Sequence, residues 1–153
     1  MAKYNGVQIK SVKSFRGHEG ELLSQGTLYI NDKKVGFYSD GDWGREPYYD
    51  WDDMEIGRQL ENSRDLNRDV MEFFILYDLE KSFKKGLRKK HDFVASLYKE
   101  YPSPIEGNPN WKMPTSTYTG VLRLHKEQIE SIAESRNEKV DWYTSLDDFV
   151  VNK

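Results

Sequence analysis

The first forty residues alternate short apolar runs with polar turns. Val7 and Ile9 alternate with polar neighbours, and two further runs of β-branched and aromatic residues span 27–30 and 35–38. A spacing of two between apolar positions, interrupted by turn residues, is typical of antiparallel strands joined by hairpins. The pattern therefore predicts a three-stranded meander over residues 6–39. One of its faces must be covered by the helices that follow, and the residues expected on that face are Leu28, Ile30, Val35 and Phe37.

From Asp65 the spacing of apolar residues changes to three and four, which is the period of a helix. The first helical segment carries Leu66, Val70, Phe73 and Tyr77. A second segment carries its apolar stripe at Phe83, Leu87, His91, Val94, Tyr98 and Tyr101. Glycine costs a helix ~1 kcal/mol relative to alanine, so we expect Gly86 to mark a break between the two segments.

Residues 102–117 contain four of the five prolines, and we expect them to form a loop. A loop of this length is either functional or wrapped over a surface. Its expected anchors are Ile105, Trp111 and Met113.

The remaining residues predict a strand, a helix, a second strand and a terminal turn. These elements are expected at 118–124, 126–136, 140–143 and 145–148, the last with a capping box. Together with the meander they indicate an α+β fold in which a small antiparallel β-sheet packs against helices. The chain has the length of one ordinary domain, so we expect a single domain over residues 1–153.

Composition narrows the class of protein. Hydrophobic residues make up 37% of the chain, below the usual ~45–50%, but 14% of residues are aromatic, so the core is expected to be small and rich in rings. The absence of cysteine excludes disulfides, thiolate metal sites and thiol nucleophiles. We find no long apolar run and no basic leader, so the sequence predicts a cytoplasmic protein without a membrane span, a secretory signal or a membrane partner.

The most unusual stretch is 38–55, which holds five aromatic rings and seven carboxylates in eighteen residues. Residues 39–61 contain two basic and eight acidic side chains, a net charge of −6, whereas the whole chain carries only −3. Charge is therefore sorted into patches, and such patches steer partners.

Local signals give this stretch a partial structure. Pro47 disfavours a helical conformation at the residue before it, so residues 48–51 are expected to be extended. A helix is expected to begin near Asp52 or Asp53, because an aspartate at a helix N-terminus accepts hydrogen bonds from unpaired amides. Some of the acidity therefore serves helix capping.

A further pattern lies between Gly6 and Gly36. It consists of Gly6-Val7, Phe15-Arg16-Gly17, Glu19-Gly20, Gly26-Thr27-Leu28-Tyr29 and Lys33-Lys34-Val35-Gly36. These residues resemble the N-terminal β meander of small uncharacterised accessory proteins of phages and mobile elements. Some phage accessory proteins are anti-defence factors, anti-CRISPR proteins among them, so the resemblance implies a binding inhibitor. It transfers no functional residue.

Rings beside carboxylates favour a contact surface for another macromolecule. Trp and Tyr are enriched at interface hot spots, and clustered carboxylates attract a basic partner. A ridge of carboxylates also imitates a phosphate backbone toward a protein that grips nucleic acid. The expected contact residues are Asp40, Asp42, Trp43, Glu46, Tyr48, Tyr49, Asp50, Trp51, Asp52 and Asp53. We therefore expect a non-catalytic binding or inhibitory protein with a basic, nucleic-acid-handling protein partner. A solvated acidic loop is the plain alternative.

A small hydrolase or metal-dependent enzyme is the first functional alternative. It would use Asp and Glu of the same stretch with His18, which lies in a glycine-flanked turn next to Glu19. Asp40-Gly41-Asp42 begins like a calcium loop, but Trp51 stands where such a loop has its twelfth-position glutamate. The sequence contains no phosphate loop, nucleophile elbow or His-Glu-x-x-His motif. It therefore favours a protein without catalytic residues, bound metal or cofactor.

Residues 81–90 hold six basic side chains. They are Lys81, Lys84, Lys85, Arg88, Lys89 and Lys90. Direct binding to DNA or RNA is the second functional alternative, and a solvated helix face is the non-functional explanation. The same residues suit the acidic stretch of a second copy, so a homo-oligomer stays open.

Overall fold

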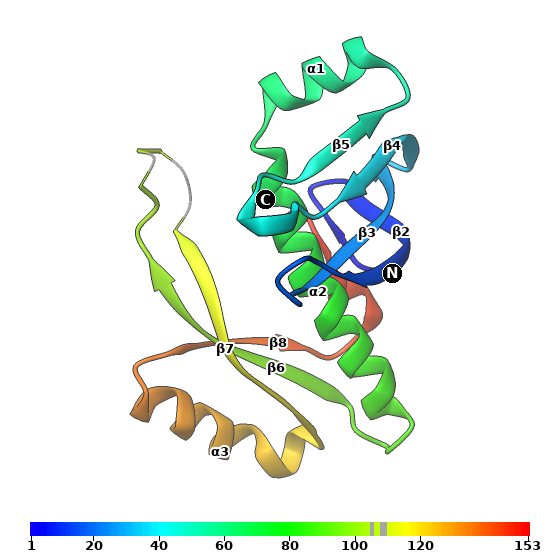
Figure 1. Cartoon of the computed structure of the whole chain (residues 1–153). Coiled ribbons are helices and arrows are strands. Elements are labelled where there is room, and N and C mark those ends of the chain that lie inside the picture. The colour runs from blue at the N-terminus through cyan, green and yellow to red at the C-terminus, as the bar shows by residue number, and fades with distance from the viewer. Residues whose placement is uncertain (105, 108–109) are drawn as a thin grey trace. The chain divides into compact units, whose positions relative to one another are not determined.

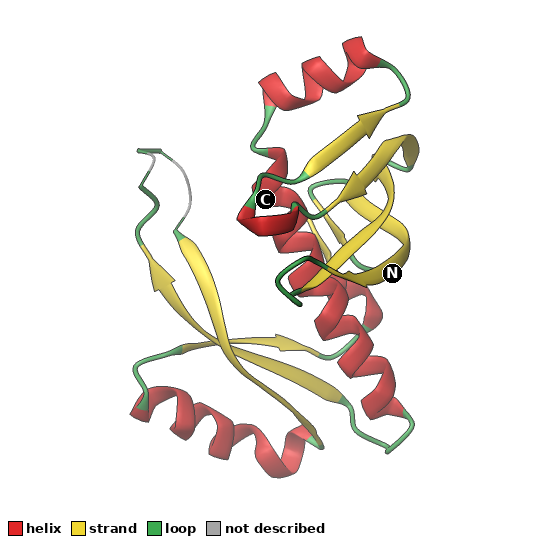
Figure 2. Cartoon of the chain, in the orientation of Figure 1, coloured by secondary structure: helices red, strands yellow, loops and turns green. Residues whose placement is uncertain are grey.

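The computed structural model describes residues 1–104, 106–107 and 110–153 (Figures 1 and 2). Within these residues the chain divides into two compact units. The meander unit comprises Ala2–Leu76 with Val150–Lys153, and the hairpin unit comprises Met1 with Tyr77–Phe149. The expectation of a single domain stays a prediction.

Six strands form the sheet of the meander unit, in the order β5-β4-β3-β2-β1-β9. They are β1 (Lys3–Tyr4), β2 (Val7–Arg16), β3 (Leu22–Ile30), β4 (Lys33–Ser39), β5 (Tyr48–Trp51) and β9 (Val150–Val151). Neighbouring strands are antiparallel except β1 and β9, which pair in parallel. The predicted meander is confirmed as β2, β3 and β4, in a sheet that is wider than predicted.

The meander unit also contains α1 (Met54–Ser63) and the first half of α2 (Leu66–Leu87). Ile9 and Leu28 of the sheet and Val70 of α2 are almost completely buried. The ring of Tyr38 in β4 lies 5.8 Å from the ring of Phe74 in α2. The core therefore lies between the sheet and α2, which is the helical cover that the apolar face of the meander required.

The hairpin unit has a three-stranded antiparallel sheet in the order β7-β6-β8. Its elements are β6 (Phe93–Tyr101), β7 (Trp111–Gly120), α3 (Leu122–Ser135), β8 (Lys139–Tyr143) and the 3-10 helix η2 (Leu146–Phe149). Alternate residues of β6, such as Ala95 and Leu97, pack with Ile129 and Ala133 of α3. Figure 1 shows α3 lying along this sheet.

The predicted helical stripe at 83–101 is wrong beyond Leu87. Both predicted segments form one helix up to that residue, without the break predicted at Gly86, and β6 begins at Phe93. The chain leaves the helical conformation at Lys90, whose φ is 62°. Residues 93–98 are buried on both faces of β6, so their apolar run shows no alternation, and periodicity alone does not separate such a run from a helix.

The predicted proline loop at 102–117 is also too long, because β7 begins at Trp111. Proline within a strand is tolerated at a sheet edge or bulge, and Pro114 lies in edge strand β7 at a register shift. Trp111 and Met113 are both exposed, so they are not buried anchors. The third predicted anchor, Ile105, lies outside the described residues.

The last predicted elements are largely confirmed. The strand predicted at 118–124 ends at Gly120, because α3 begins two residues later and includes most of the helix predicted at 126–136. The predicted strand at 140–143 is β8, and the Asp148 carboxylate caps the terminal turn. Three helices and two sheets thus make the described chain α+β, as predicted. None of these helices is both long and apolar enough to cross a bilayer.

Candidate functional site

The acidic segment, residues 40–55, runs from the end of β4 through the 3-10 turn η1 (Asp42–Gly44) and β5 into α1. Because side chains alternate across a strand, its rings do not share one surface. Tyr49 and Trp51 stack 5.3 Å apart on one side of β5, and Tyr38 of β4 lies 5.5 Å from Tyr49 on that side. These three rings form the covered face of the β4–β5 pair.

Helix α1 covers Trp51 directly. Gly57 of α1 is buried, and a Cβ atom at this position would lie 2.3 Å from the indole ring. Glycine therefore allows the helix to approach the ring. The start of α1 is fixed by Asp53, whose carboxylate accepts hydrogen bonds from the amides of Glu55 (2.9 Å) and Ile56 (3.3 Å). The predicted helix start is confirmed, and Asp53 serves as a helix cap.

Tyr48 and Asp50 point to the opposite side of β5. Phe37 of β4 pairs with Asp50, so these three residues share a face, which we call the outer face. Tyr48 is 62% exposed and Phe37 is 38% exposed. Within the described residues Asp50 makes no side-chain hydrogen bond or ion pair. Asp52 continues the same alternation and lies 3.9 Å from Lys34, an exposed pair of the kind that contributes little stability.

Asp40 has an internal role. Its carboxylate accepts a hydrogen bond from the backbone amide of Ser24 (2.7 Å) and contacts the hydroxyl of the buried Tyr38. Burial, and then the hydrogen bond to Asp40, raises the pKa of Tyr38 above its ordinary value. Asp40 therefore satisfies donors of its own unit and does not belong to the outer face.

Asp42 joins η1 to the turn between β2 and β3. Its carboxylate accepts hydrogen bonds from the amides of His18 (3.1 Å) and Trp43 (2.9 Å) and contacts Nδ1 of the His18 ring. Burial would raise the pKa of Asp42, but the hydrogen bonds from the ring and the backbone amide of His18 hold it below its ordinary value. A Cβ atom at Gly17 would meet oxygens of Glu21 and Asp42 at 2.2 and 2.6 Å. The two turns therefore form a tight junction.

Trp43 lies on this junction and is 58% exposed. Its ring makes an edge contact with the His18 ring, with centroids 5.3 Å apart. Its backbone is left-handed, with φ 61° and ψ 34°, which costs an L-residue about 1–2 kcal/mol. An aromatic edge contact contributes about 0.5–1.5 kcal/mol. Because these two effects nearly cancel, the indole adds little to the stability of the unit.

The contact of His18 with Asp42 brings together two groups that the enzyme alternative requires. Among the described residues, however, no hydroxyl group hydrogen-bonds to the His18 ring, and no three His, Asp or Glu side chains are grouped as metal ligands. What the geometry shows is a structural junction. The expectation of a protein without catalytic residues, metal or cofactor stays a prediction.

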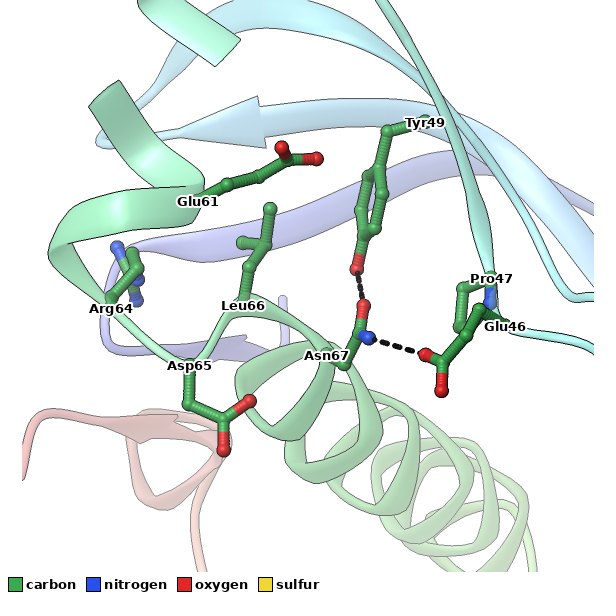
Figure 3. A pocket seen from close by; sticks show the side chains of 8 residues that line it. All are labelled: Glu46, Pro47, Tyr49, Glu61, Arg64, Asp65, Leu66 and Asn67. Atoms are coloured by element: carbon green, nitrogen blue, oxygen red, sulfur yellow. Dashed lines mark hydrogen bonds between the residues drawn. The ribbon is translucent and has the colours of Figure 1, made fainter. Parts of the chain in front are cut away.

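Glu46 and Tyr49 line an open pocket of about 300 Å³ (Figure 3). The other lining residues are Pro47, Glu61, Arg64, Asp65, Leu66 and Asn67. The Tyr49 hydroxyl donates to Asn67 (2.6 Å), and the Asn67 amide donates to Glu46 (3.0 Å). Burial, and then the charges of neighbouring carboxylates, raises the pKa of Tyr49 above its ordinary value. The pocket is therefore acidic, and its two predicted site residues are already bonded to α2.

In the hairpin unit, the basic segment, residues 81–90, occupies the end of α2 and the following turn. Lys81 lies 5.1 Å from the centre of the Tyr77 ring, and Lys84 pairs with Glu80 at 3.3 Å. The other four side chains, which make no ion pair or hydrogen bond within the described chain, are Lys85, Arg88, Lys89 and Lys90. Positive charge at a helix C-terminus interacts favourably with the helix dipole.

The ten predicted contact residues thus do not share one surface. Eight divide among the outer face, the junction, the pocket and the covered face, whereas Asp40 is an internal acceptor and Asp53 a helix cap. Glu21 was not predicted, because its place depends on two turns that meet only in the fold.

The prediction that Phe37 lies on the covered face of the meander with Val35 is wrong. The register shift between Leu28 and Tyr29 interrupts the alternation of β4, so Phe37 is exposed while Val35 and Tyr38 are buried.

Comparison with protein-family models, curated proteins and solved structures gave no match.

Proposed function

We propose that this chain is a non-catalytic binding protein that engages a basic partner protein through part of its acidic segment. The contact is made by the outer face and by Trp43. The proposal includes inhibition of that partner, which the phage-type resemblance implies. It also includes a partner that handles nucleic acid, because clustered carboxylates imitate a phosphate backbone.

The observation that carries the proposal is the uncovered outer face. Tyr48 is largely exposed beside Asp50, although Tyr49 and Trp51 of the same short strand are covered. An exposed tyrosine offers a large and rigid contact area, and a carboxylate without an internal partner is available to a partner's lysine or arginine.

Internal bonding reduces the number of carboxylates that a partner would meet. Asp40, Asp42 and Asp53 accept hydrogen bonds from backbone amides of their own unit. Asp50 and Asp52 are therefore the principal contact acids of the proposal. Imitation of a phosphate backbone would depend on these two and on the negative field of the whole segment.

The test is capture of proteins from a bacterial lysate with immobilised wild type and an Asp50→Asn/Asp52→Asn/Asp53→Asn variant. Asparagine at position 53 keeps the helix cap, so α1 is preserved. A Glu127→Gln/Glu130→Gln/Glu134→Gln variant changes the charge equally on exposed positions of α3. We expect wild type and control to retain a basic protein that the first variant loses, with binding that weakens as salt rises. Equal retention by all three, or binding that ignores salt, would contradict the proposal.

A further inference from the structure

We propose that Trp43 is the anchor of this interface and that its indole receives an arginine side chain of the partner. The inference rests on the proposed function, and it adds the residue that makes the central contact and the chemistry that it recognises. It is carried by the backbone conformation of Trp43, by the junction beneath it and by the exposure of its ring.

The backbone conformation is unfavourable for tryptophan. Seven non-glycine residues of the described chain have positive φ: Asn5, Ser11, Asn31, Asp32, Trp43, Lys90 and Asn137. Four of these are Asn or Asp, whose short polar side chains tolerate this region, whereas a bulky residue there is an outlier. Trp43 has the largest side chain of the seven. Such outliers persist where the surroundings enforce them, and they cluster at functional sites.

The junction beneath Trp43 enforces that conformation. The Trp43 amide donates to Asp42 (2.9 Å) and also approaches Glu21 (3.4 Å). Asp42 is held in turn by His18, and Gly17 leaves no space between the two turns. The indole therefore projects from a fixed base. A partner that binds a preorganised ring loses less conformational entropy than one that must order a mobile loop.

The chemistry around the ring selects a cation. The face of an indole attracts cations more strongly than the other aromatic rings do. Glu21 adds negative charge next to the Trp43 backbone, and within the described residues its Oε2 atom is buried without a hydrogen-bond partner. A planar guanidinium stacks on an aromatic face, whereas an ammonium is a compact and strongly hydrated charge. Arginine is therefore the side chain that this site favours.

The test measures calorimetric affinity for an oligo-arginine peptide and for an oligo-lysine peptide of equal length. The two probes carry the same charge, but a guanidinium can also bind carboxylates through two hydrogen bonds, so the part of the preference that depends on the ring reports stacking. We expect wild type to prefer oligo-arginine. Trp43→Gly should weaken oligo-arginine binding about tenfold and reduce the preference. Trp43→Phe should retain part of the preference for oligo-arginine. The control is Trp111→Ala, which changes an exposed tryptophan of the hairpin unit and should leave the preference unchanged.

Thermal unfolding of the same variants supplies the second readout. Glycine adopts positive φ freely but loses more chain entropy on folding, so Trp43→Gly should unfold within a few degrees of wild type. A midpoint several degrees lower would show that the indole is a packing residue, and an unchanged arginine preference would show that it is no anchor. If the triple asparagine variant lost the peptides while Trp43→Gly kept them, only the anchor assignment would fall. If neither variant changed peptide binding, the proposed function would fall with it.

Discussion

Asp40, Asp42 and Asp53 of the meander unit each accept hydrogen bonds from backbone amides, whereas Lys85 and Arg88 of the hairpin unit make no side-chain bond within the described residues. Both segments are dense in charge, but the acidic one is largely folded into its unit and the basic one is not. Charge density in a sequence therefore does not by itself predict a contact surface. A side chain without an internal role is available to a partner, and its apolar neighbours decide whether it belongs to a favourable contact surface.

The apolar neighbours of the two segments differ as well. In the acidic segment, strand alternation places Tyr48 outside and Tyr49 inside. In the basic segment, helical spacing buries Phe83 and leaves Leu87 exposed among the lysines. Two large exposed aromatic residues, Trp43 and Tyr48, therefore accompany the acids, which is why we propose a contact surface on the meander unit.

Of the substitutions that test this comparison, Asp40→Ala should cause the largest loss of stability. It leaves the Tyr38 hydroxyl and the Ser24 amide without their acceptor, and an unsatisfied buried donor costs about 1–3 kcal/mol. We expect the free energy of unfolding, measured in urea, to fall by about 2–3 kcal/mol. Asp50→Ala is the matched control and should stay within about 0.5 kcal/mol of wild type. Equal values for the two variants would mean that the acidic segment is not divided as described.

The acidic segment shows which features of the fold can be predicted from the sequence and which cannot. The meander, the start of α1 at Asp53 and the extended conformation of 48–51 follow from turn residues, capping chemistry and proline, which act locally. The partners of Asp40 and Asp42 do not follow, because Ser24 and His18 are distant in the chain and meet them only through the register of β3 and β4. Strand β6 was wrongly predicted as part of a helix, because its residues are buried on both faces and therefore lack the alternation that identifies strands.

Gly57→Ala should have the next largest effect, because it acts on the covered face. Overpacking against Trp51 costs about 1–3 kcal/mol, and alanine recovers about 1 kcal/mol of helix propensity. We therefore expect a net loss of about 1 kcal/mol in the free energy of unfolding and a changed fluorescence of Trp51. Gln59→Ala, at an exposed position of α1, should show only the propensity gain. If Gly57→Ala were more stable than wild type, α1 would not pack closely against the Trp51 ring.

Replacing Lys85, Arg88, Lys89 and Lys90 together by glutamine should have the smallest effect on stability. These side chains have no described partner to lose, and their interaction with the helix dipole is weak and screened by salt, so we expect a loss below about 1 kcal/mol. A loss of several kcal/mol would mean that the basic segment is as structural as Asp40. Because the variant should fold normally, it also tests the nucleic-acid alternative directly. Duplex DNA bound by wild type with a steep salt dependence, and released by this variant, would move the contact surface to the hairpin unit.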